Sequence, residues 1–147
     1  MMEEAESCLR EAVSCGRVGR FQLEAAIQSA HAQRLRSGDA DWETIALLYE
    51  GLMALAPTIG ASVGRAAAVA EARGPQVGWD LLEAVPRAEA ANYQPYWAVA
   101  AHLLAKLGRT AEAGVAYDLA IGLCEDPAMR DWLRRRALAV SLEGDTA

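Results

Sequence analysis

The chain has 147 residues, 53% of them hydrophobic and 23% charged, and its 20 acidic and 14 basic residues give a net charge of -6. This length and composition predict a single domain with a core of its own, and they exclude an intrinsically disordered chain. An acidic domain repels phosphate backbones, so we expect no direct binding of DNA or RNA, even though 130–136 is locally rich in arginine.

The first predicted helix begins at once, because the opening segment MMEEAESCLREAV is acidic and amphipathic. Such a segment is neither a secretory signal nor a membrane span, so we expect a cytoplasmic protein that does not enter the membrane. Cys8, Cys15 and Cys124 are odd in number and fall on helical patterns, which favours small buried apolar side chains in a reducing cytosol. A metal site needs more ligands at CxxC-like spacing, and we predict neither a metal nor another cofactor.

Alanine is abundant, and every strongly patterned segment has a helical period instead of the alternation of a strand. The sequence therefore predicts an all-α fold of about eight helices, whose short connections make consecutive helices antiparallel. The predicted helices cover about 2–15, 20–36, 42–56, 59–73 and 75–85, then the segment from the Asn92 cap to Leu107, then 111–124 and 127–143.

Capping residues and helix breakers set these boundaries. A short polar side chain can accept from the free backbone N–H groups of a first helical turn. The predicted N-caps are Asp41, Thr58, Asn92 and Thr110. Pro75 suits the first turn of its helix, Asp126-Pro127 is a start signal, and RAEAAN at 87–92 is predicted to be a loop. The predicted stops are Gly16, Gly19, Pro57, Gly74, Pro86 and Gly108.

The segment 93–127 has the spacing of a tetratricopeptide repeat, a helix pair of about 34 residues. It reads W-x3-A-x2-L-x3-G-x4-A-x3-Y-x2-A, which places small and large residues alternately on the facing sides of two helices. The expected contact residues are Trp97, Ala101, Leu104, Ala113, Tyr117 and Ala120. The small residues let the two backbones approach, and we expect Trp97 and Tyr117 to fill the space beside the crossing.

Weaker copies of this spacing occur earlier in the chain. Those that repeat the second-helix offsets are Ile45, Tyr49, Leu52 and Pro57, and those of a degenerate first helix are Val63, Ala67 and Gly74. We therefore expect one tetratricopeptide-like stack of helical hairpins over 1–147. It divides into first helices with a degenerate repeat at 1–57, a degenerate repeat at 58–92, the best-matching repeat at 93–127 and a capping helix at 127–143. The alternative is chance similarity within an alanine-rich bundle.

Stacked repeats of this kind turn their first helices toward a concave surface, where partners bind. The side chains that flank the packed positions of those helices are the binding candidates: Phe21, Glu24, Gln28, His31, Gly64, Glu71, Ala98 and His102. Because imidazole titrates near neutrality, His and Glu in one hollow could do acid–base chemistry, or they could be polar residues of a binding groove. No nucleophile is paired with a base in the sequence, so the sequence assigns no catalytic residue.

Five segments carry a family resemblance: GRVGRFQLEAAIQSAHAQ, DWETIALLYEGLMALAPT, GRAAAVAEARGPQVGWDLLEAV, NYQPYWAVAAHLLAKLGRTAEAGVAYDLAI and MRDWLRRRAL. Together they resemble, over roughly 2–140, the C-terminal tetratricopeptide-like extension of one class of bacterial extracytoplasmic-function RNA polymerase sigma factors. In that family the extension follows two domains that bind DNA and polymerase, and it controls their activity through protein contacts. The resemblance implies a regulatory interaction module whose partners are sigma-factor domains or RNA polymerase.

This sequence departs from that family in ways that bear on function. It contains neither sigma domain, and Gly64 and His102 stand where the family tends to have Asn and Asp. Both positions fall on the expected concave surface. They leave a second hypothesis open, in which a free-standing domain has been refitted to bind a small molecule or to catalyse a proton transfer or cyclisation. Under that hypothesis Gly64 makes room that an Asn side chain would fill.

Overall fold

The computed structural model describes residues 19–38 and 41–145, and their secondary structure is entirely helical, as the periodicity predicts. The helices are α2 (Arg20–Ser37), α3 (Trp42–Leu55), α4 (Ile59–Arg73), α5 (Pro75–Glu83), α6 (Arg87–Ala90), α7 (Gln94–Lys106), α8 (Thr110–Leu123) and α9 (Pro127–Asp145). No strand occurs in these ranges. The helix predicted at about 2–15, together with Gly16, Cys8 and Cys15, lies outside the described residues.

Two of the predicted N-caps are confirmed. The backbone N–H of Thr44 donates to Asp41 Oδ1 over 3.1 Å, and the Thr44 hydroxyl donates to Asp41 Oδ2 over 2.8 Å. At the start of α4 the N–H of Ala61 donates to Thr58 Oγ1 over 3.1 Å. These side chains satisfy donors that a first helical turn leaves without a backbone partner, and each is worth about 1 kcal/mol. Pro75 is the first residue of α5, as predicted.

The predicted cap at Thr110 is wrong, because α8 starts one residue earlier. Its N-cap is Arg109, which makes no side-chain capping bond. The chain leaves α7 through Gly108 at a φ of 78°, and the N–H of Arg109 donates back to the carbonyl of Leu104 over 2.9 Å. This closure reverses the chain so tightly that Thr110 already has a place in the first turn.

The segment predicted as a loop at 87–92 contains the short helix α6, and Asn92 is not a cap. Pro86 fixes its own φ at -58° and offers its carbonyl to the N–H groups of Glu89 and Ala90, both over 3.1 Å. The turn that follows places Tyr93 at the N-cap of α7, without a side-chain capping bond. Pro86, which the sequence predicts to end the preceding helix, therefore also starts α6.

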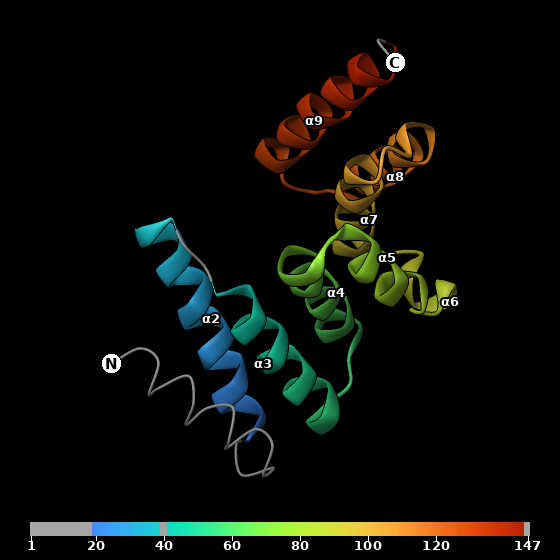
Figure 1. Cartoon of the computed structure of the whole chain (residues 1–147). Coiled ribbons are helices and arrows are strands. Elements are labelled where there is room, and N and C mark those ends of the chain that lie inside the picture. Colours follow the sequence, from blue (N-terminus) through green and yellow to red (C-terminus); the bar gives the residue numbers. More distant parts are fainter. Residues whose placement is uncertain (1–18, 39–40, 146–147) are drawn as a thin grey trace.

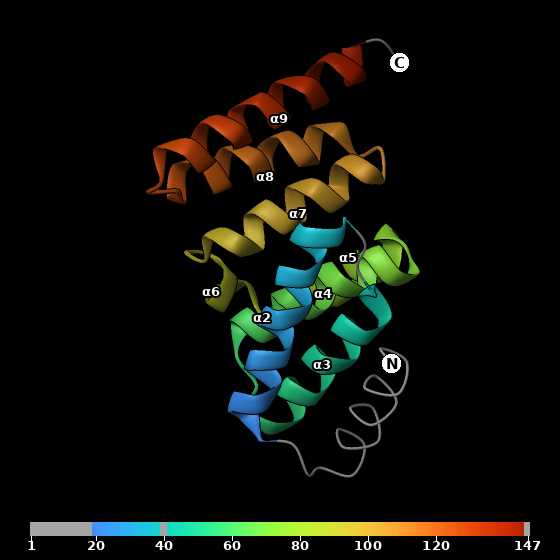
Figure 2. The same cartoon turned by 90° about the vertical axis from the view of Figure 1, so that its left-hand side faces the viewer.

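The helices form pairs that follow one another in a curved stack (Figure 1). Helix α2 packs on α3, α4 on α5, and α7 on α8, while α3 and α5 join neighbouring pairs and α9 covers α8. Turned by 90°, the molecule shows α2 and α3 in front of α4, with α7, α8 and α9 following one another above them (Figure 2). Successive helix pairs that pack on one another agree with a stack of helical hairpins. None of the helices in the described part of the chain is long and apolar enough to cross a membrane.

The contact between α7 and α8 has the predicted composition, with one exception. The alanines at the crossing are buried, and Tyr117 is 2% exposed among them. Trp97 is only half-buried, and its Nε1 donates to the Ala91 carbonyl over 3.2 Å at the edge of the core. Its neighbour Tyr96, 7% exposed, takes the deeper position. The Trp97 ring therefore covers the core from outside, with its polar edge on a turn, instead of filling the crossing.

Helices α4 and α5 meet more closely than any side chain would allow at Gly78. A Cβ at this position would lie 2.7 Å from the carbonyl oxygen of Ala66 and 2.9 Å from the Cα of Ala70. Glycine is required here by the distance between the two backbones, since Gly78 is helical and needs no special dihedral angle. Nearby core positions are also small, which lets α5 lie flat on α4 and contact α7 on its other side.

Candidate functional site

A partly open cleft of about 300 Å³ lies on the side of the stack that α2, α4 and α7 share. We call it the inner cleft. Its base is made by small residues of α4 and α7, among them Ala67, Ala68 and Ala98. Its walls are aromatic, with Trp42 and Tyr49 from α3 and Trp132 from α9. The cleft exists because α4 presents side chains too short to reach α7 across this part of the contact.

Five of the eight binding candidates predicted from the sequence line the inner cleft: His31, Gly64, Glu71, Ala98 and His102. Phe21, Glu24 and Gln28 do not. Phe21 is 81% exposed, and Glu24 pairs with Arg20 over 3.0 Å on the surface of α2. Because a helix rises about 1.5 Å per residue, Phe21 lies roughly 15 Å from His31 along α2. Only the last turns of α2 reach the cleft, which helical spacing alone does not reveal.

The sequence did not predict the aromatic walls of the inner cleft, or its basic rim, which is formed by Arg34, Lys106 and Arg136. Trp42 and Tyr49 belong to α3, a helix expected to face away from the hollow. Trp132 belongs to the helix expected only to cap the stack, and it is 48% exposed. A signal did exist in the sequence, since Trp132 and Arg136 are spaced to lie on one face of a helix. Their pairing is real, with the Arg136 guanidinium 5.4 Å from the ring centroid.

Gly64 does not enlarge the hollow in the way its sequence position suggests. A Cβ on Gly64 would lie 2.5 Å from Cζ of Tyr49 and 2.8 Å from its hydroxyl oxygen. The space is therefore already filled by the tyrosine ring, which crosses the α4 backbone here. Burial raises the pKa of this phenol, with the nearby Tyr93 as a second cause, so Tyr49 is a neutral hydrogen-bonding group in the cleft wall.

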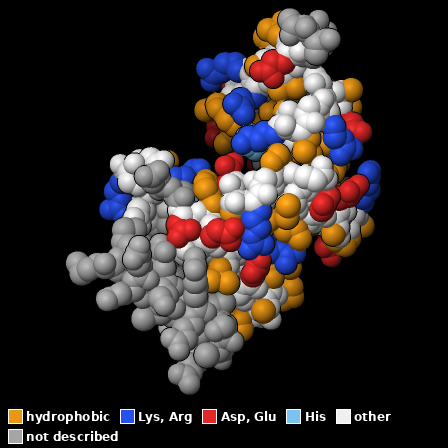
Figure 3. Space-filling model, viewed as in Figure 1, with side chains coloured by type: hydrophobic (Ala, Val, Ile, Leu, Met, Phe, Trp, Pro, Cys, Tyr) orange, Lys and Arg blue, Asp and Glu red, His pale blue; other side chains and the backbone are white. Residues whose placement is uncertain are grey.

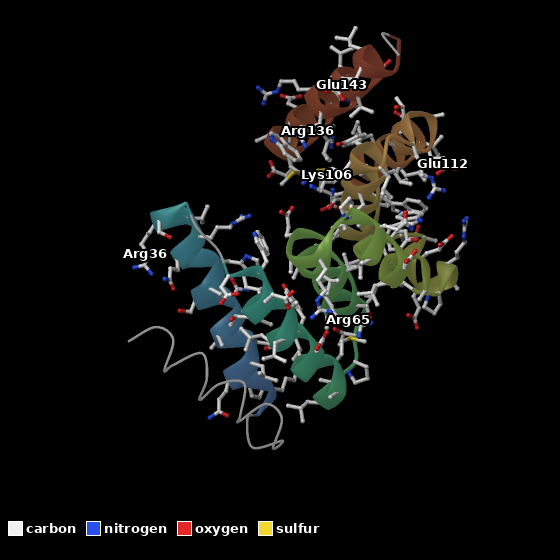
Figure 4. The ribbon with its side chains drawn as sticks, viewed as in Figure 1. Arg36, Arg65, Lys106, Glu112, Arg136 and Glu143 are labelled. Carbon is white, nitrogen blue, oxygen red and sulfur yellow. The ribbon has the colours of Figure 1, made fainter. Side chains whose placement is uncertain are left out.

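His102 lies between a carboxylate and two cations. Its Nε2 is 3.7 Å from Glu71 Oε1, its Nδ1 is 3.4 Å from Arg136 Nη2, and Lys106 Nζ is 3.8 Å from the same Glu71 oxygen. Figure 4 shows Lys106 and Arg136 projecting from α7 and α9 on the same side of the molecule. Because a guanidinium can only donate, Nδ1 accepts and the proton of neutral His102 is on Nε2, facing Glu71.

The two histidines of the cleft are neutral at physiological pH. Burial lowers the pKa of His102 below 6.5, the positive charges of Lys106 and Arg136 lower it further, and Glu71 opposes them. Burial and the adjacent Arg34 likewise lower the pKa of His31. The His31 ring meets Trp42 edge to face at 6.4 Å. Both imidazoles can therefore donate and accept hydrogen bonds without adding charge.

This arrangement suits binding more directly than catalysis. The cleft offers an apolar base, aromatic walls, two neutral imidazoles and a basic rim, which are the parts that hold and orient a ligand or a partner side chain. Among the described residues no three His, Cys, Asp or Glu side chains are grouped to hold a metal ion. Cys124, the one cysteine within the described ranges, is buried in the α7 and α8 core and lies outside the cleft.

Comparison with known proteins aligns this chain with part of a longer protein. An uncharacterized protein of Rhizobium meliloti (strain 1021) is 34% identical over 134 residues. Those residues are 91% of this chain and 31% of that protein, so the chain spans about a third of the length of its relative. No family model matches the chain, and no solved structure matches it.

Proposed function

We propose that this chain is a regulatory protein-interaction module, related to the C-terminal extension of extracytoplasmic-function sigma factors, with the inner cleft as its contact surface. The observation that carries the proposal is the cleft itself, which residues of α2, α4 and α7 line together. The alignment with part of a longer protein supports a role beside other domains. The partners would be sigma-factor domains or RNA polymerase.

Direct binding to sigma domains tests this function. The experiment titrates the purified chain, by calorimetry, against the two sigma domains of extracytoplasmic-function sigma factors from the same genome. We expect binding in the micromolar range, and we expect Ala98→Trp to weaken it at least tenfold because the indole fills the cleft. Ala111→Trp is the matched control, since Ala111 is exposed on α8 outside the cleft. Equal binding by the two variants, or no binding to either sigma domain, would reject the proposal.

A second function has its own observation in favour. A hollow of about 300 Å³ with a mainly apolar lining and a few convergent polar groups is at the lower end of the range for small-molecule sites. The alternative is therefore a domain that binds a small molecule in the inner cleft. Chemistry on that molecule would use His31, His102 or Glu71, the two imidazoles and the carboxylate of the lining.

A further inference from the structure

The rim of the inner cleft has a charge opposite to that of the whole chain. The chain carries a net charge of -6, yet Arg34 lines the cleft, and Lys106 and Arg136 contact its lining residues Glu71 and His102 from outside. Glu71 is the single acidic residue of the lining. These three cations come from α2, α7 and α9, so the fold brings them together from separate parts of the sequence. Figure 3 shows histidine surface in the notch, next to a group of basic side chains.

Two of these cations have donor groups to spare. Arg34 stacks on Trp42 at 5.3 Å from the ring centroid, and Arg136 stacks on Trp132 at 5.4 Å. Neither forms an ion pair with another described residue. A stacked guanidinium keeps its N–H groups in the plane of the fork, where they can meet a carboxylate with two parallel hydrogen bonds. The stacking also holds each arginine in place before a ligand arrives.

The interior of the cleft determines the size and polarity of the part of the ligand that lies inside it. Much of its lining is apolar, with three alanines, Val99 and Leu103, whose side chains offer no hydrogen bonds. The polar groups of the lining are few and include Glu71 and the two imidazoles. A volume of about 300 Å³ corresponds to roughly ten water molecules, which is the size of one or two fused rings. A body of that size is held by apolar burial and by stacking between aromatic walls.

We infer that the inner cleft binds a small organic anion, a flat apolar ring system of one or two rings that carries a single carboxylate. The ring system occupies the alanine-lined base, and the carboxylate reaches the rim at Arg136, which has donor groups to spare. Lys106 projects on the same side of the molecule and adds positive charge there. This inference rests on the small-molecule function named second above, and it gives that function a ligand class. A cationic ligand is disfavoured because it would place its charge among three fixed positive charges.

A series of three probes of one shape separates the contribution of the charge from that of the ring. Naphthalene-2-carboxylate, naphthalene-2-carboxamide and 2-naphthylmethylamine are titrated into the full chain, with tryptophan fluorescence and calorimetry as readouts. We expect the carboxylate to bind at least tenfold more tightly than the amide, which is about 1.4 kcal/mol, and the amine to bind most weakly. The preference for the carboxylate should shrink as salt is added, because the rim is exposed to solvent.

Substitutions at Arg136 and Lys106 test where the carboxylate of the ligand binds. Arg136→Met keeps much of the apolar stem and removes the charge, so it should cost the carboxylate at least tenfold and leave the amide unchanged. Arg135→Met is the matched control, because Arg135 is exposed and one residue away, whereas the contacts with His102 and Trp132 are made by Arg136. Lys106→Met is the second variant, in case Arg136→Met unfolds the helix. Equal binding of carboxylate and amide would overturn the inference while leaving the small-molecule function standing. If none of the three probes binds at 1 mM, a concentration that corresponds to about 4 kcal/mol, the inference is also overturned, even if sigma domains bind the cleft.

Discussion

At the level of single residues, the contact between Gly64 and Tyr49 decides the shape of the inner cleft. The tyrosine ring occupies the volume that any side chain at 64 would need. We expect Gly64→Ala to lower the free energy of unfolding by about 1–3 kcal/mol, because the ring or α4 must shift. Thermal unfolding measures this change. In a double-mutant cycle Tyr49→Leu should recover part of the loss, and strictly additive effects would mean that the two residues do not clash.

We expect His102 to make the folded protein less stable in mild acid. Its folded pKa lies below 6.5, so between that pKa and 6.5 the unfolded chain binds more protons than the folded one. Neutral His102 therefore contributes fully to the free energy of unfolding above about pH 6.5. This contribution is lost as the pH falls through the folded pKa, with a slope of at most about 1.4 kcal/mol per pH unit. Chemical denaturation between pH 7.5 and 5 should show this decline, and His102→Gln should flatten it. His31→Gln is the comparison, since burial and Arg34 also lower the pKa of His31.

At the level of helices, the contact between α7 and α8 contains one aromatic residue inside the core, Tyr117, and one that covers it from outside, Trp97. Tyr117 is enclosed among alanines, whereas Trp97 is half-buried with its Nε1 on the Ala91 carbonyl. We expect Tyr117→Ala to destabilise by about 3–5 kcal/mol and Trp97→Ala by clearly less, because less apolar surface and a smaller cavity are involved. Guanidinium denaturation of both variants tests this order. A larger loss for Trp97→Ala would show that the covering ring contributes more than the buried one.

Helix boundaries illustrate what the sequence could and could not predict. Asp41 and Thr58 follow breaks in the chain with their side chains free to bend back, and both cap as predicted. At Arg109 the start of the helix is set by the reversal at Gly108, which depends on the end of the preceding helix more than on local side chains. Repeat spacing likewise placed His31, Gly64 and His102 toward one side. It could not place Trp132 or Arg34, because their position depends on how far the stack curves.

At the level of the whole molecule, we expect the excess of acidic charge to oppose nucleic-acid binding more than the arginines of α9 favour it. Arg130 donates to the Cys124 carbonyl over 2.7 Å, Arg134 lies 3.6 Å from Asp131, and Arg136 faces His102. Each of these three arginines therefore already has a contact within the protein. We expect no binding to duplex DNA at 150 mM salt in a fluorescence-anisotropy titration. A micromolar complex that weakens steeply with added salt would contradict this.

The absence of a side chain at Gly78 has a mechanical consequence. Helix α5 rests on α4 at this glycine and touches α7 on its other side, so the crossing joins the half of the stack that holds Arg34 to the half that holds Arg136. We expect a change at this crossing to be larger at the two ends of the stack, because each half is built from helices that pack on one another. We expect Gly78→Ala, a substitution outside the cleft, to alter the separation of spin labels placed at Leu35 and Leu138, which are both exposed. Unchanged label distances would mean that the local backbone absorbs the methyl group, and that the span between the two ends is fixed elsewhere.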